Sequence, residues 1–270
     1  MVLLGLKRGY WLAIAFLSAD GKSFEPIGSF VGKVNEPVKL LIQRSPAPAS
    51  QEEIAVVPQE YNGTTMFLEA MEDSIQVMDR GGAKIGYIHI WSYAGDQYQE
   101  KLEETLLFGE LKNADALVLD LRDGWGGAWP NYLNIFGEGL RVTSVRRDGD
   151  RRTTASTWDK PVVLLVNERS RSGKEILAYG FQTLKLGPVV GSKTAGAVVA
   201  GTAFILEDGS LLYLAVSDVY LDEGKRLEGV GVVPDIEVPF TVDYAQGADP
   251  QKERALVVAS QLVQQPAKTS

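Results

Sequence analysis

Residues 160–176, KPVVLLVNERSRSGKEI, contain the most informative pattern in this chain. The segment begins with a continuous apolar run, passes through a polar turn and ends in residues that favour a helix. An apolar run of this length is typical of a strand that is buried on both faces of a sheet. The segment therefore predicts a buried strand that leads directly into a helix, with Ser172 at the junction.

The same pattern recurs on both sides of this segment. Apolar runs predict buried strands at 84–93 and 115–122, and helical apolar spacing predicts helices at 96–111 and 173–184. A short strand is expected at 187–191. Strands that alternate with helices require crossover connections, so the chain is predicted to have an α/β fold.

The ends of the chain add smaller elements. Strands are expected at 36–44 and 53–59, on either side of a polar loop, and they predict a small β-rich unit that ends near residue 60. Residues 61–82 are expected to be a connector that contains one short strand at 74–78. The remaining expected elements are a helix at 130–140 beginning with Pro130, strands within 200–240 with turns at EDGS and DEGK, and a helix at 249–263 with Asp249 as N-cap.

The composition of the 270 residues excludes several kinds of site. The formal net charge of −8 disfavours a dedicated nucleic-acid or anionic-membrane binder. The absence of cysteine excludes disulfides and thiolate catalysis, and a single histidine, His89, excludes a multi-histidine metal site within one chain. No stretch approaches the roughly 20 apolar residues that a membrane span requires, although residues 1–20 have the outline of a short signal peptide.

A glycine-rich loop follows the predicted strand at 115–122. The stretch 119–129, LDLRDGWGGAW, contains Gly124, Gly126 and Gly127. Glycines permit unusual backbone dihedral angles, so N–H groups of such a loop can point into a cleft and bind a phosphate or an oxyanion. The plainer alternative is a tight turn between a strand and a helix. The loop is not a phosphate-binding Walker motif, because it lacks the final Gly-Lys-Ser/Thr.

Ser172 occupies the equivalent place after the strand at 160–168. A hydroxyl at a helix N-terminus lies in a positive field that favours a developing alkoxide, although a serine there is most often only a helix cap. The carboxyl ends of parallel strands lie along the same edge of a sheet, where ligands bind. Ser172 and the N–H groups of the glycine loop are therefore predicted to meet at that edge.

Six segments occur in an order that resembles one enzyme family: IGYIHIWSY, LVLDLRDGWGG, PVVLLVNERSRSGKEI, VVGSKTAGA, LEDGSLL and RLEGVGVVPDIEV. They are similar to the core of the C-terminal processing (tail-specific) serine peptidases, and the chain looks closer to the tricorn-core and retinoid-binding-protein-like branch. The resemblance covers residues 84–240. It implies a crotonase-like core of ββα units at 61–241, preceded by a partial PDZ-like lobe at 1–60 and followed by a C-terminal helix and tail at 242–270.

The resemblance also implies roles for individual residues. Ser172 matches the nucleophile, the N–H groups of Gly126 and Gly173 match the oxyanion hole, and Glu228 matches an acidic residue that orients the catalytic groups. The implied substrate is a protein or peptide, cleaved through an acyl-enzyme without any cofactor or metal. The resemblance favours an extracytoplasmic location and leaves homo-oligomerisation open.

The chain departs from the family pattern at the general base. The Ser/Lys branch has a lysine 25 positions after the serine, where this sequence has Ala197. The other branch takes a histidine from a segment before the PDZ domain, and this chain is expected to begin inside that domain. Lys193 and His89 are the candidate bases, although a surface lysine and a structural histidine are the plainer interpretations. Lys174 is expected to face solvent, and Glu175 matches an acidic family position.

Trp125, Trp129 and Tyr132 flank the glycine loop, where they line a substrate pocket or plug the core beneath the loop. The sequence thus predicts a serine peptidase whose activity as an isolated chain is weak. Two alternatives remain open. One is a non-catalytic remnant that binds peptides by strand addition to its PDZ-like lobe, and the other is a serine esterase on the same fold.

Overall fold

A computed structural model describes residues 33–264, apart from 61, 63, 64, 242 and 244. The possible signal peptide and the first part of the predicted PDZ-like lobe lie outside the described residues. The described residues form two compact units. The first comprises residues up to 73 together with 240–250, and the second comprises 74–239 together with the rest of the last helix.

The first unit contains a β-hairpin and a helix. Strands β1 (Val38–Gln43) and β2 (Gln51–Val56) pair antiparallel around the 3₁₀ turn η1 (Pro48–Ser50), which confirms both predicted strands. Leu40 and Ile42 are buried, and three residues pack against them: Val38, Ile54 and Val56. Helix α2 (Met66–Ser74) was not predicted, because residues 61–82 were interpreted as a connector.

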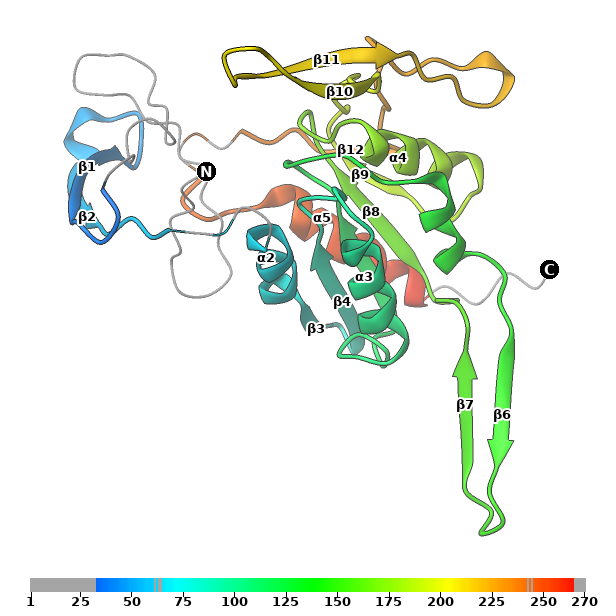
Figure 1. The fold of residues 1–270 in the computed structure, drawn as a ribbon. Coiled ribbons are helices and arrows are strands. Elements are labelled where there is room, and N and C mark those ends of the chain that lie inside the picture. The colour runs from blue at the N-terminus through cyan, green and yellow to red at the C-terminus, as the bar shows by residue number, and fades with distance from the viewer. Residues whose placement is uncertain (1–32, 61, 63–64, 242, 244, 265–270) are drawn as a thin grey trace. The chain divides into compact units, whose positions relative to one another are not determined.

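The second unit is built on one six-stranded sheet (Figure 1). Its strand order is β12-β9-β8-β5-β4-β3. The strands are β3 (Gln76–Arg80), β4 (Ala83–His89), β5 (Ala116–Asp120), β8 (Val162–Val166), β9 (Val189–Gly191) and β12 (Ile236–Glu237). Only the edge pair β3–β4 is antiparallel, so this is a mixed α/β sheet with parallel strands at its centre. The predicted central strands and the α/β class are confirmed.

Helices cover both faces of this sheet (Figure 1). Helix α5 (Pro250–Gln264) packs Ala255, Leu256 and Ala259 against alternate residues of the central strands, including Val118 and Val163. Helices α3 (Gln97–Leu107) and α4 (Gly173–Thr183) lie on the opposite face. The central strands β5 and β8 are buried at every position, which is why their sequences are continuously apolar.

Two β-hairpins extend from the second unit. Strands β10 (Ala200–Ile205) and β11 (Leu211–Ser217) were expected, and they turn at EDGS. Strands β6 (Arg141–Val145) and β7 (Arg151–Ala155) were not predicted, because this polar ribbon has no apolar face. The helix expected at 130–140 is a 3₁₀ helix, η2 (Pro130–Phe136), and DEGK forms part of the short 3₁₀ turn η3 (Asp222–Gly224).

This topology decides where a site can form. Because β4, β5, β8 and β9 are parallel, the four segments that follow them leave from the same edge of the sheet. The glycine loop follows β5, Ser172 follows β8, and the segment with Lys193 and Ala197 follows β9. The fold therefore brings together residues that are far apart in sequence, since Gly126 and Ala197 are 71 positions apart.

Gly187 provides a test of the close packing between β8 and β9. A Cβ atom at this position would lie 1.9 Å from the carbonyl oxygen of Val162, so the backbone would have to shift. We expect Gly187→Ala to lower the free energy of unfolding by about 1–3 kcal/mol, measured by urea denaturation. Gly137→Ala is the control, because its added Cβ would be 3.4 Å from the nearest atom. Equal stabilities of the two variants would contradict this packing.

Candidate active site

The glycine loop is held tightly against the segment that follows β4. Trp125 N–H donates to the carbonyl oxygen of Trp91 at 2.7 Å, and Tyr93 N–H donates to that of Gly126 at 3.0 Å. Gly124 has φ 70°, and a Cβ there would lie 2.0 Å from the Trp91 oxygen. This position therefore requires glycine for its dihedral angle and for its close contact.

Ser172 has a strained backbone. It is the N-cap residue of α4, with φ 57° and ψ −131°. Few non-glycine residues adopt positive φ, and the strain persists only where surrounding interactions enforce it. Here Ser172 N–H donates to the Ala197 carbonyl at 2.9 Å, and Glu175 N–H donates to the Ser172 carbonyl at 2.8 Å. These bonds hold the half-buried serine on a sharp turn between strand and helix.

The structure brings Ser172 and the glycine loop together. A Cβ atom placed on Gly126 would be 2.4 Å from the Cβ of Ser172 and 2.9 Å from its Oγ. Gly173 is equally close to the far end of the loop, since a Cβ there would be 2.4 Å from the nitrogen of Ala128. Among the described residues, neither the Gly126 N–H nor the Gly173 N–H donates a hydrogen bond to a protein acceptor. Both groups are therefore able to donate to a ligand beside Ser172.

The buried carboxylate of Glu175 stabilises the turn at Ser172. Its side chain is 0% exposed. One carboxylate oxygen accepts from Thr194 Oγ1 at 2.6 Å and Gly196 N at 2.7 Å. The other accepts from Ala197 N at 2.8 Å and Ser172 N at 3.2 Å. One carboxylate thus joins the start of α4 to the segment after β9.

Glu228 also stabilises the segment that follows β9. It accepts hydrogen bonds from the N–H groups of Val198 at 2.6 Å and Val199 at 3.0 Å. These bonds lower the pKa of Glu228, the one from Val198 having the larger effect. Both hydrogen bonds join Glu228 to this segment and not to Ser172, so its geometric role is to hold residues 198–199. Ala197 itself is exposed.

Lys174 differs from its prediction. It was expected to face solvent, but it is 0% exposed. Its Nζ donates to the carbonyl oxygens of Asp123 at 2.7 Å and Trp91 at 3.1 Å. Burial lowers the pKa of Lys174 to about 7, against the opposing effects of Asp120 and Asp123. No sequence pattern indicates this burial, because the two carbonyls belong to segments far from Lys174 in the chain.

His89 belongs to a buried polar network under the sheet edge. Its Nε2 donates to the carbonyl of Arg122 at 2.9 Å, and its ring stacks on Trp91. Asp120 accepts from Arg122 Nη2 at 2.7 Å and from Tyr87 Oη at 2.8 Å. Burial alone would raise the pKa of Asp120, but the Arg122 guanidinium outweighs it and holds that pKa well below its usual range. This placement favours the structural interpretation of His89.

The other predicted residues lie nearer the surface. Lys193 is exposed, as its plainer interpretation predicted. Trp125 and Trp129 are 62% and 63% exposed, so they do not plug the core, whereas Tyr132 is buried. The exposed indole groups of Trp125 and Trp129 belong to the glycine loop and are accessible to a substrate.

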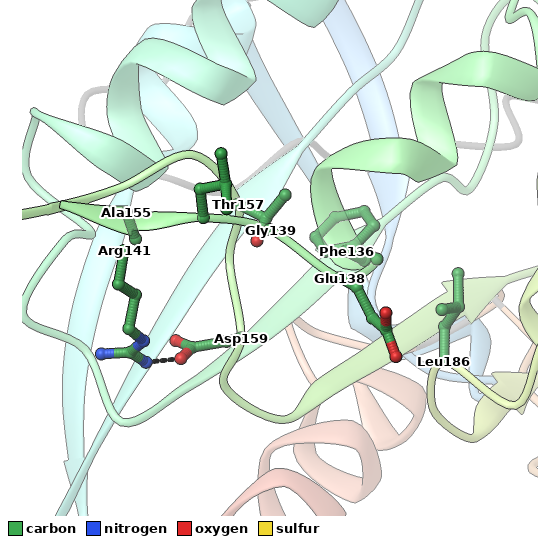
Figure 2. Close-up of a pocket in the computed structure, with 10 residues that line it drawn as sticks. Phe136, Glu138, Gly139, Arg141, Ala155, Thr157, Asp159 and Leu186 are labelled. Carbon is green, nitrogen blue, oxygen red and sulfur yellow. Dashed lines mark ion pairs between the residues drawn. The ribbon is translucent and has the colours of Figure 1, made fainter.

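The structure also has a separate cavity of about 370 Å³ at the base of the β6–β7 hairpin (Figure 2). Arg141 and Asp159 form an ion pair on its wall, and Phe136 and Leu186 also line it. Neither Ser172 nor the glycine loop contributes to the lining. Hence this cavity is not the site formed by the strand-end loops.

A strained serine at a strand-to-helix turn, as Ser172 is here, is an arrangement shared by many hydrolases with α/β folds. The model of peptidase family S41 matches residues 84–238, which is more than half of the chain. The chain therefore belongs to peptidase family S41, whose members are serine peptidases. The resemblance inferred from the six ordered motifs is confirmed.

Named relatives agree with this family. A carboxyl-terminal-processing protease of Synechocystis is 29% identical over 213 residues, which are 74% of this chain and 50% of the relative. The tricorn protease of Thermoplasma acidophilum is 32% identical over 189 residues, which are 67% of this chain and 17% of that protein. The chain thus spans half the length, or less, of these relatives.

Solved structures agree on the fold. The crystal structure of the tricorn protease has a TM-score of 0.58 at 21% identity, over 86% of this chain and 23% of that one. Mature CPAF complexed with lactacystin has a TM-score of 0.51 at 15% identity, over 84% of this chain and 68% of that one. At these identities the likeness concerns the fold alone.

None of the described helices is long and apolar enough to cross a membrane.

The Glu175 carboxylate can be tested by an isosteric change. Glu175→Gln replaces an acceptor by an NH₂ group that faces donors, leaving buried N–H groups unsatisfied. We expect the free energy of unfolding to fall by about 2 kcal/mol, measured by urea denaturation. Glu168→Gln serves as control, because Glu168 is exposed. A Glu175→Gln variant as stable as the control would show that the carboxylate is not the anchor.

His89 predicts a pH dependence of stability. Burial lowers its pKa to about 4 from 6.5, so between these values the unfolded chain binds a proton that the folded chain does not. Above about pH 6.5 the histidine is neutral in both states, and its full contribution to stability is kept. As the pH falls from there to about 4, the free energy of unfolding decreases by an amount on the order of 3 kcal/mol. We expect His89→Gln to flatten the curve of unfolding free energy against pH in this window. An unchanged slope would exclude the shift.

Proposed function

We propose that this chain is the catalytic part of a serine peptidase that cleaves proteins or peptides through an acyl-enzyme at Ser172. The observation that carries the proposal is the contact between Ser172 and Gly126 at the carboxyl edge of the parallel strands. Membership of peptidase family S41 supports the same role. The substrate class follows from relatives named as carboxyl-terminal-processing and tricorn proteases.

The proposed chemistry uses the two N–H groups beside the serine. Ser172 Oγ attacks the substrate carbonyl carbon, and the carbonyl oxygen becomes an oxyanion. The Gly126 and Gly173 N–H groups donate to that oxyanion, with α4 directing its positive N-terminal end toward it. The hydroxyl proton of Ser172 passes to the general base and from it to the leaving amine, which departs neutral. Water, deprotonated by the same base, then releases the acyl group, and the proton returns to Ser172 Oγ. The exposed Trp125 and Trp129 are proposed to contact the substrate chain.

The general base is the missing part of this arrangement. The segment after β9 is held by Glu175 and Glu228 and presents Ala197 where the Ser/Lys branch has its lysine. His89 is hydrogen-bonded to Arg122 in the buried network, and Lys193 is an exposed side chain. We therefore propose that the isolated chain acylates slowly, and that a base from outside the described residues raises its rate.

The finer details of the fold form part of the same proposal. We propose that the second unit is a crotonase-like core, because its parallel strands alternate with helices that cover both faces. We propose that β1 and β2 belong to a partial PDZ-like lobe, because they form a hairpin with its own small apolar cluster. An extracytoplasmic location stays a prediction from the family resemblance.

The nucleophile is tested by covalent labelling. A fluorophosphonate and an activated phenyl ester are expected to modify the parent chain at Ser172, identified by peptide mass spectrometry. Ser172→Ala should lose the modification completely, because no hydroxyl remains to attack. Ser170→Ala is the control at a neighbouring buried serine whose Oγ donates to Leu121 O. Equal labelling of parent and Ser172→Ala would mean that the serine is a helix cap and would favour a peptide-binding module.

The base is tested by restoring the family lysine. Ala197 is exposed, so Ala197→Lys places an amine on an ordered segment without burying it. We expect at least a tenfold increase in the cleavage of unstructured peptides, since a positioned base contributes about 10²–10⁴-fold in rate. The double variant Ala197→Lys with Ser172→Ala should be inactive. Efficient cleavage by the parent chain would show that a base is already present.

A further inference from the structure

Lys174 takes no part in the proposed reaction, although burying its amine is energetically unfavourable. Its side chain is fully buried two residues after Ser172, and its Nζ donates to two backbone carbonyls. A buried amine is unfavourable unless its hydrogen bonds are satisfied. An apolar side chain would fill this place without that cost, so the two hydrogen bonds point to a specific use.

The two carbonyl acceptors define that use. The oxygen of Asp123 belongs to the first residue of the glycine loop, which has φ 56°. The oxygen of Trp91 also accepts the Trp125 N–H at 2.7 Å, so a single carbonyl contacts both the lysine and the loop. Lys174 therefore joins α4, the segment after β4 and the loop that carries the Gly126 N–H.

The charged groups around Lys174 agree with a positioning role rather than a role as a base. Asp120, Asp123, Arg171 and His89 are the charged or titratable groups that act on it. The Nζ is directed toward the carbonyls of Trp91 and Asp123, and no hydrogen bond joins it to Ser172 within the described residues. A pKa lowered to about 7 leaves the amine with N–H donors in either protonation state.

We propose that Lys174 is a positioning residue that holds the glycine loop, and with it the Gly126 N–H, at the distance from Ser172 that oxyanion stabilisation requires. This inference rests on the proposed function, because it deepens the role of the same site. It predicts that loss of the two hydrogen bonds frees the loop while Ser172 stays on its turn. Ser172 is held separately by Glu175 and Ala197.

The first measurement is independent of catalysis. Lys174→Met keeps the length of the side chain and removes both hydrogen bonds. Amide hydrogen exchange, followed by NMR, should become at least tenfold faster at Trp125 N–H and remain within twofold at Ala197 N–H, which Glu175 holds. Lys185→Met is the control, because Lys185 is an exposed lysine at the other end of α4. Unchanged exchange at Trp125 overturns the proposal.

The second measurement concerns the reaction. Acylation by the activated ester is measured over a range of ester concentrations and is normalised to the sites titrated by fluorophosphonate. Lys174→Met should lower the limiting rate at least tenfold with the half-saturating concentration within twofold, because an oxyanion donor acts in the transition state. A merely destabilised variant would lose titratable sites and keep its rate per site. An unchanged rate per site overturns the proposal.

Chemical rescue provides the third measurement. Lys174→Ala leaves a buried space that matches the propylammonium ion, which replaces the missing carbons and the amine. Added propylammonium should raise the acylation rate of Lys174→Ala at least fivefold. Tetramethylammonium, a cation without N–H donors, should leave that rate unchanged. Equal effects of the two ions overturn the proposal. If the parent chain is never acylated at Ser172, the proposed function fails, and the exchange at Trp125 still decides whether Lys174 holds the loop.

Discussion

The buried carboxylate of Glu175 is the constraint on which the site depends. It carries a charge into the interior and is satisfied there by neutral donors alone, three backbone N–H groups and one hydroxyl. A buried charge without such partners would cost several kcal/mol, so the donors cannot move away independently. Thr194 extends this linkage, since it accepts a hydrogen bond from Val232 N–H while donating to Glu175. These hydrogen bonds therefore join three parts of the chain: the start of α4, the segment after β9 and the chain near residue 232.

The sequence predicted those features that depend on local pattern or on topology. The buried strands β5 and β8 were predicted because every position is apolar, and the meeting of Ser172 with Gly126 was predicted because parallel strands end at one edge. Helix α2 was missed because a glycine and threonines precede it, and β6–β7 was missed because a ribbon without a buried face has no alternation. The burial of Lys174 was beyond sequence reasoning, since its partners Trp91 and Asp123 lie 83 and 51 residues away.

Two layers of hydrogen bonds meet at Ser172, and different groups supply them. Glu175 and Glu228 hold the segment after β9, whereas backbone pairs with Trp91 and Tyr93 hold the glycine loop. Ala197 lies in the first layer and Gly126 in the second. The side chain at position 197 supports neither layer, because only the backbone of Ala197 takes part in the hydrogen bonds. A substitution of this side chain therefore leaves the backbone framework around Ser172 intact.

The positive φ of Ser172 gives this position two opposed selective pressures. A β-carbon in this backbone conformation costs of the order of 1–3 kcal/mol, and glycine would relieve it. On stability alone, substitution at this position would favour glycine, which carries no β-carbon. Serine at φ 57° therefore keeps its hydroxyl at a cost in stability, and the proposed nucleophilic role would account for that cost.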